Sequence, residues 1–160
     1  MLKRHFLFAA TIIALLAGCA STSNPVSVAD TIAARPQLTT LNSLIVKAGL
    51  TDTLKGTGPF TVFAPSNEAF AKVPAKTMES LASDPAKLKA VLTYHVISGK
   101  VMVADVKNGN SKTVNGANLA LSRAGDFVTV EEAMVQTPDI PAINGVVHIV
   151  DSVLMPPASR

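Results

Sequence analysis

The sequence predicts an α+β domain in which a layer of helices packs on an antiparallel sheet. In its first half, apolar residues recur at three- and four-residue spacing, which is typical of helices with one buried face. In its second half, short alternating runs are separated by the pairs Asn108-Gly109, Asn115-Gly116 and Gly125-Asp126, which favour turns. Because helices and strands are segregated along the chain, alternating parallel units are not expected.

The residues before the domain predict export. Residues 1–18 have the pattern of a secretory leader, because Lys3 and Arg4 precede an apolar run. This run is shorter than the roughly 20 apolar residues that a membrane-spanning helix needs. Its end, Leu-Ala-Gly-Cys, resembles a bacterial lipobox. The resemblance implies a lipoprotein signal peptide over 1–18 and lipidation of Cys19.

Cys19 is the only cysteine of the chain. The sequence therefore offers no disulfide and no second thiol that could act as a nucleophile. Two or more acyl chains would hold the protein on a membrane surface without spanning it. Residues 19–24 then form the lipidated cysteine and a short polar tether. Ala20, which is not acidic, favours the outer membrane in a host that has one.

Residues 25–157 have the length of a single domain, and 158–160 form a short tail. The net charge of +3 includes Lys3 and Arg4 of the leader, so 12 basic side chains remain against 11 acidic ones. Basic residues form no stripe and aromatic residues are few. Both features argue against nucleic acid as a partner.

Helices are expected to open the domain. One follows Ser27, and a second runs from Pro36 to Gly49 with a regular apolar stripe. Asp84, followed by Pro85 in the favoured first position, begins another. We expect the apolar stripes of these helices to face the core, because that is the usual role of such a stripe.

Residues 61–74 combine a strand, a turn and a helix. The run around Phe63 is apolar on both faces, which predicts a strand buried on both sides. Pro65 ends the strand, and the Ser66 hydroxyl can cap the helix that follows. Phe70 of this helix is expected to point to the core.

Strand patterns dominate the rest of the chain. Residues 136–142 contain two prolines and are expected to be extended and exposed. Further strands are expected at 94–97, around 113, and at 119–121, 127–130 and 146–154.

Three stretches resemble the conserved boxes of fasciclin-type domains: 61–74, 92–100 (LTYHVISGK) and 144–156 (NGVVHIVDSVLMP). They occur in the order and at the spacing of that family. The resemblance implies a fasciclin-like fold, with an N-terminal helical layer packed on a wedge-shaped antiparallel β-sandwich. It also implies structural roles for Thr61, Phe63, Ala64, Pro65, Asn67, Phe70, Asn144, Gly145, His148 and Asp151.

No catalytic group is expected. In a regular strand His148 shares a face with Val146 and Val150, whereas Asp151 lies on the opposite face, so the two do not pair. Ser66 lacks the glycines of a nucleophile elbow, and capping explains it. The sequence therefore predicts a protein that is not an enzyme, with a hydrolase as the weakest alternative.

A metal site is also not expected. His95 and His148 could meet in space and recruit Asp105 or Glu68, but they lack thiolate partners and helical spacing. The fasciclin resemblance implies that both histidines are internal hydrogen-bonding struts. Replacing His148 should then cost about 1–3 kcal/mol of stability without abolishing a reaction. No cofactor is expected.

The resemblance implies an adhesion or interaction module at the cell surface or in the periplasm, whose partner is a protein or a matrix or cell-surface component. Two candidate contact regions resemble stretches implicated in receptor binding by animal relatives: Tyr94-His95 and Asp139-Ile140. By residue type, Tyr94, Val96 and Ile97 are rather expected to belong to the core. The competing hypothesis is a carrier of an apolar small molecule such as a carotenoid, since some relatives hold carotenoids.

Overall fold

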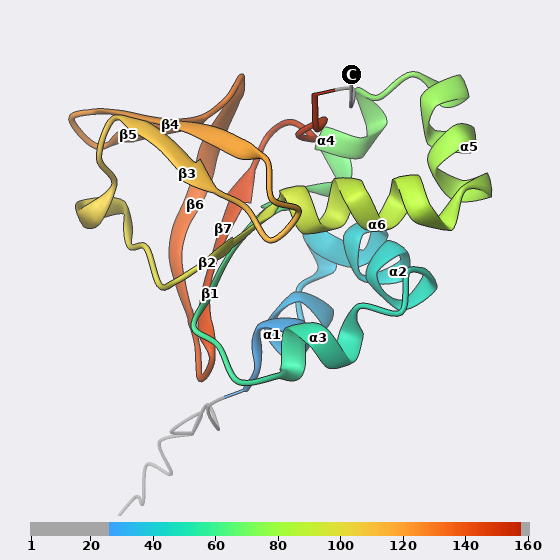
Figure 1. Ribbon diagram of the computed structural model, residues 1–160, viewed down its shortest axis with the longest axis horizontal. Coiled ribbons are helices and arrows are strands. Elements are labelled where there is room, and N and C mark those ends of the chain that lie inside the picture. Colours follow the sequence, from blue (N-terminus) through green and yellow to red (C-terminus); the bar gives the residue numbers. More distant parts are fainter. Residues whose placement is uncertain (1–25, 158–160) are drawn as a thin grey trace, which may run out of the picture.

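The computed structural model describes residues 26–157 (Figure 1). The predicted leader, Cys19, the tether and the tail 158–160 lie outside these residues. No helix of the described part is long and apolar enough to cross a membrane. The helices are α1 (Val28–Ala33), α2 (Thr39–Lys47), α3 (Thr51–Lys55), α4 (Asn67–Ala71), α5 (Ala75–Ser83) and α6 (Pro85–Tyr94), with 3-10 turns η1 (Pro36–Leu38) and η2 (Val103–Asp105).

Side-chain caps begin three of these helices, as the sequence predicts. The Ser27 hydroxyl accepts the Asp30 N–H before α1, and the Ser66 hydroxyl accepts the Ala69 N–H before α4. Asp84 accepts two backbone N–H groups at the start of α6. These local bonds set where each helix begins, and so which face it turns to the sheet.

Seven strands form one continuous sheet in the order β2-β1-β7-β6-β5-β4-β3. All neighbouring pairs are antiparallel except β1 and β7, which run parallel from Phe60↔Gly145 to Pro65↔Val150. An isolated bridge from Ile97 to Thr113 joins the two edges, so the sheet nearly closes on itself. The strands are β1 (Phe60–Pro65), β2 (Val96–Ser98), β3 (Gly109–Lys112), β4 (Asn118–Ala124), β5 (Phe127–Val130), β6 (Ala133–Ala142) and β7 (Gly145–Val150).

Two hydrophobic cores lie on opposite faces of the central strands β1 and β7. Val62 and Ala64 of β1 face a core shared with the helices. Phe63 of the same strand faces a second core, enclosed by the curved sheet. β7 does the same, with Val147 on the helical side and Val150 on the other. The prediction of a strand buried on both faces is thus confirmed, and Figure 1 shows the helices gathered on one side of this pair.

The predicted strand over 94–97 is wrong at its start. Tyr94 is the last residue of α6, His95 caps the helix, and β2 begins only at Val96. The helix extends this far because the His95 ring and the His95 backbone both bond to the Val91 carbonyl, one turn earlier.

Residues 136–142 are extended but not uniformly exposed. They form most of β6, which pairs with β7 with register shifts on either side of Thr137. Within this irregular stretch Asp139 has a φ of 54°, a left-handed conformation that Asp tolerates better than most residues. Ile140 is buried after it. The expectation of exposure is therefore wrong for Ile140.

Candidate functional site

His95 joins the end of α6 to the segment after β7. Its Nδ1 donates to the Val91 carbonyl oxygen at 2.8 Å, and its Nε2 accepts the Leu154 N–H at 3.0 Å. Because the ring donates from one nitrogen and accepts on the other, its partners require the neutral form. The ring is fully buried, and this burial lowers the pKa of His95 to about 4.

His148 holds the segment after β2, residues 99–103, against the sheet. Its Nδ1 accepts the Asp139 N–H at 3.0 Å, and its Nε2 lies 2.8 Å from the Val101 carbonyl oxygen and donates to it. The ring also stacks on Phe63 at a centroid distance of 5.5 Å. Burial lowers the pKa of His148, although the Asp139 carboxylate 3.9 Å away acts in the opposite direction. Burial prevails, and a proton on Nδ1 would also displace the bond from the Asp139 amide.

The segment after β2 is fixed by side chains from three strands. The Thr61 hydroxyl donates to the Gly99 carbonyl at 2.6 Å and accepts the Val101 N–H at 2.8 Å. The Asp139 carboxylate accepts the Val103 N–H at 2.9 Å. Together with His148, these bonds hold the backbone of 99–103 in one place. His148 therefore braces a loop on the sheet, whereas His95 braces the helical layer.

These partners leave the histidines no free ring nitrogen. In residues 26–157 no group of three His, Cys, Asp or Glu side chains lies together as a metal site would need. Ser66 is engaged as the cap of α4, 3.2 Å from the Ala69 nitrogen. Asp151 accepts the Met134 N–H at 2.8 Å and lies near Lys72, not His148.

Asn67 and Phe70 attach α4 to the rest of the domain. The Asn67 side chain accepts the Thr40 N–H at 3.0 Å and donates to the Pro36 carbonyl at 2.9 Å. Phe70 is buried in the core between helices and sheet. These contacts hold α4 against η1, α2 and the core.

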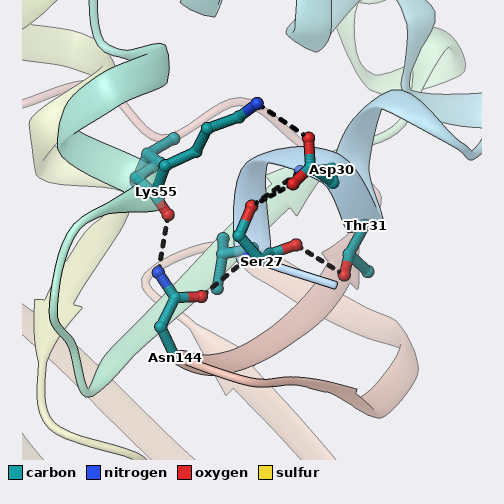
Figure 2. A network of polar contacts seen from close by, with 7 residues as sticks. Ser27, Asp30, Thr31, Lys55 and Asn144 are labelled. Atoms are coloured by element: carbon teal, nitrogen blue, oxygen red, sulfur yellow. Dashed lines mark hydrogen bonds and ion pairs between the residues drawn. The ribbon is translucent and has the colours of Figure 1, made fainter. Parts of the chain in front are cut away.

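Asn144 ties three distant segments together (Figure 2). Its Oδ1 accepts the Val28 N–H at 2.8 Å, and its Nδ2 donates to the carbonyls of Leu54 and Gly56, both at 2.8 Å. The start of α1, the end of α3 and the turn before β7 thus meet at one amide. In the same network Lys55 pairs with Asp30 at 3.0 Å.

Replacing Asn144 with Ala is expected to lower the free energy of unfolding by about 2 kcal/mol, because three partly buried backbone groups lose their partner. Chemical denaturation would measure the change. Asn115→Ala is the matched control. This residue is exposed on a turn, so the control should change stability by less than about 0.5 kcal/mol. Equal effects of the two substitutions would contradict the structural role of Asn144.

A profile of the Fasciclin domain matches residues 36–156 of this chain. The chain belongs to the Fasciclin domain family. α1 precedes the matched region, yet its Val28 and Ile32 lie in the same core as β1 and β7.

Relatives of this Fasciclin domain occur in several bacteria. Protein sll1483 of Synechocystis sp. is 39% identical over 86% of this chain and 78% of its own length. The immunogenic protein MPB70 of Mycobacterium bovis is 39% identical over 84% of this chain and 70% of its own. The cell surface glycolipoprotein MPB83 of Mycobacterium bovis is 39% identical over 82% of this chain, which spans only 61% of MPB83.

The fold is similar to a solved FAS1 domain pair from the insect cell adhesion molecule fasciclin I. The TM-score is 0.64 at 18% identity, over 81% of this chain and 51% of that one. A likeness at this identity establishes the fold alone. It agrees with the α+β, fasciclin-like fold class that the sequence predicts.

Three of the four predicted contact residues are buried inside the Fasciclin domain. Tyr94 and His95 are each 2% exposed and Ile140 is also buried, so these three side chains are not accessible to a partner. The Tyr94 hydroxyl lies 3.1 Å from both the Asn118 carbonyl and the Glu131 carboxylate, and burial with this carboxylate raises the pKa of Tyr94 to about 12. Only Asp139 remains partly exposed.

The most exposed large apolar side chain of the described residues is Phe127, at 66%. Thr129, two residues on, pairs with Met134 of β6, so Phe127, Thr129 and Met134 share the outer face of the sheet. We call these three residues the outer-face patch. It was not among the residues expected to contact a partner. Strand parity could have found it, because Val128 and Val130 point inward and leave Phe127 and Thr129 pointing outward.

An apolar cavity lies between α2, α3, α6 and β1. Leu41, Ile45, Leu54, Val62 and Leu92 contribute to its lining. Its volume is about 30 Å³, far below the roughly 300 Å³ or more of pockets that hold small molecules. A carotenoid would require this space to open widely.

Proposed function

We propose that this chain is an exported, lipid-anchored interaction module without enzymatic activity. Two observations on relatives support the proposal: one is named a cell surface glycolipoprotein, and a structural neighbour comes from a cell adhesion molecule. The lipobox-like residues before Cys19 support the anchor. Ala20 after the cysteine favours the outer membrane if the host has one.

The polar groups that could carry chemistry are used to hold backbone in place. His95 and His148 are neutral, and each donates and accepts one backbone bond. Ser66 caps a helix. A general base needs a free nitrogen within reach of a substrate proton, and a nucleophile needs such a base. These residues therefore favour a rigid scaffold over a hydrolase.

The observation that carries the proposed contact face is the exposure of Phe127 and Met134 on the same face of the sheet. Aromatic and methionine side chains are enriched in the buried centres of protein interfaces. On this face the two lie on paired strands of a continuous sheet, which gives them a fixed backbone. We propose that the outer-face patch contacts a protein or matrix component outside the cell, and that Asp139 is not required for the contact.

The double variant Phe127→Glu, Met134→Lys should abolish saturable adhesion of beads carrying the mature protein to cells or envelope material of the source organism. Two charges would replace the apolar centre of the contact. Bound beads counted against protein density give the measurement. The control is Val46→Glu, because Val46 is 61% exposed but lies on α2.

Circular dichroism should show all three proteins folded. Loss of adhesion with Val46→Glu as well, or retention with the double variant, would exclude the outer-face patch. Absence of saturable adhesion by the parent would contradict the interaction module itself. If the purified protein instead carries colour or a non-covalently bound apolar molecule, the cavity does open, and the carrier alternative replaces our proposal.

Cys19→Ala is expected to move the protein from the membrane fraction to the soluble fraction, because the acyl chains supply about 0.8 kcal/mol per buried methylene. Fractionation followed by mass spectrometry of the N-terminal peptide measures both location and lipid. Ser21→Ala, two residues away, should leave the distribution unchanged. A parent chain without lipid would contradict the anchor.

A further inference from the structure

One end of the domain combines exposed apolar and basic side chains. Ile143, in the turn between β6 and β7, is 62% exposed, and its N–H bonds to the Val26 carbonyl at 3.0 Å. Val26 is itself exposed. Lys55, Lys100 and Ile143 line an open hollow beside this turn. We call Val26, Lys55, Lys100 and Ile143 the tether end, because Val26 is the first described residue (Figure 1).

The charge at this end is weakly positive. Lys55 is paired with Asp30, as Figure 2 shows. Lys100 is exposed and forms no ion pair with any residue in 26–157. Long basic side chains beside exposed aliphatic ones match a lipid surface, where apolar groups enter the acyl boundary and ammonium groups stay at the phosphates.

The length of the chain between Cys19 and Val26 decides which end of the domain can reach the membrane. Seven residue steps separate Cys19 from Val26. Seven residue steps span at most about 25 Å. Met134 of the outer-face patch lies near the start of strand β6, which ends at Ala142 at the tether end. Because β6 is bulged, the paired residues Gly145 to Asp151 cover this distance with fewer residues, and at about 3.3 Å per residue the patch lies roughly 20 Å from the tether end.

We propose that the tether end rests on the lipid surface, with Ile143 and Val26 at the headgroup boundary and Lys100 at the lipid phosphates. This inference rests on the proposed lipidation of Cys19. A short tether makes the contact intramolecular, so even two apolar side chains and one ammonium group are held against lipid at high effective concentration. The consequence is a fixed orientation, in which the outer-face patch points away from the membrane toward a partner.

A polarity-sensitive fluorophore would test the orientation. The lipidated full chain carries no free thiol, because the lipid consumes Cys19, so a single introduced cysteine is labelled alone. We would label Ile143→Cys and, as the matched control, Phe127→Cys, since the two side chains are exposed to a similar extent. Both proteins are reconstituted in vesicles of phosphatidylcholine and phosphatidylglycerol whose acyl chains carry brominated quenchers.

The expected result is blue-shifted emission and several-fold stronger quenching at position 143 than at position 127. In vesicles containing phosphatidylglycerol, Lys100→Glu should weaken the quenching at 143. In phosphatidylcholine alone it should have little effect. If Ile143→Cys does not fold, Val26→Cys provides the same readout.

Equal quenching at the two positions, or stronger quenching at 127, would overturn the orientation. The mass of the protein in the same preparation shows whether the chain is lipidated. It therefore separates this outcome from a failure of the anchor. A lipidated chain with a solvated label at 143 overturns only this inference. A native chain without lipid overturns the anchor and this inference together.

Discussion

The free energy of unfolding should fall by about 3 kcal/mol between pH 6.5 and pH 4 through His95 alone. Burial holds the folded-state pKa near 4, whereas the unfolded chain titrates near 6.5. Within this window the unfolded state binds one more proton than the folded state, so acid favours unfolding. The contribution of His95 is complete above pH 6.5 and is lost as the pH falls toward 4.

Chemical denaturation at a series of pH values would measure this loss. His148, whose pKa is also lowered, adds to it in the same direction. The carboxyl groups of Asp30 and Asp84 also have lowered pKa values, so their contributions are lost at more acid pH, below their usual value of 3.8.

His95→Phe isolates the contribution of His95. Phenylalanine keeps the ring but leaves the Leu154 N–H without its acceptor, at a cost of about 2 kcal/mol near neutral pH. Because phenylalanine does not titrate, the stabilities of parent and variant should converge and then cross as the pH falls from 6.5 to 4, since the parent begins about 2 kcal/mol ahead and loses about 3 kcal/mol. Parallel curves over this range would show that His95 is not held neutral in the fold.

Gly145→Ala is expected to cost about 3 kcal/mol or more, because a Cβ at this position would collide with the Phe60 carbonyl oxygen. The collision is with backbone, which cannot turn aside as a side chain can. Phe60↔Gly145 is the first pair of the parallel ladder between β1 and β7, so the strain acts where the central strands begin. The midpoint of denaturation should fall, or the variant should fail to fold.

Gly125→Ala is the matched control. Gly125 has a φ of 63° and nothing within 4 Å of an added Cβ, so only the left-handed backbone opposes the substitution, at about 1 kcal/mol. A larger loss at 125 than at 145 would contradict the close approach of β1 and β7. Retention of parent stability by Gly145→Ala would do the same.

Local chemistry made several features predictable. The caps Ser27, Ser66 and Asp84 each bond within three residues of their own position, so the relevant partners are visible in sequence. Strand parity correctly separated His148 from Asp151, because alternation needs no knowledge of other strands. The structural roles of Asn144 and Gly145 came from the fasciclin resemblance, which named the residues but not their contacts.

Other features depended on segments far apart in the sequence. Tyr94 and His95 looked available to a partner, yet the sheet and the Leu154 segment bury them. Phe127 looked like an ordinary strand residue. Its exposure follows from the fact that Val128 and Val130 occupy the inner face and nothing in 26–157 covers the outer one.

The sequence by itself determined the α+β class, the helix starts and the buried central strand, because these follow from spacing and from bonds between near neighbours. Only the tertiary structure decided that β1 runs parallel to β7, that Asn144 joins α1 to α3, and that Gly145 faces the Phe60 carbonyl. Each of these contacts joins residues more than 80 positions apart along the chain. No pattern among neighbouring residues can therefore indicate the partner.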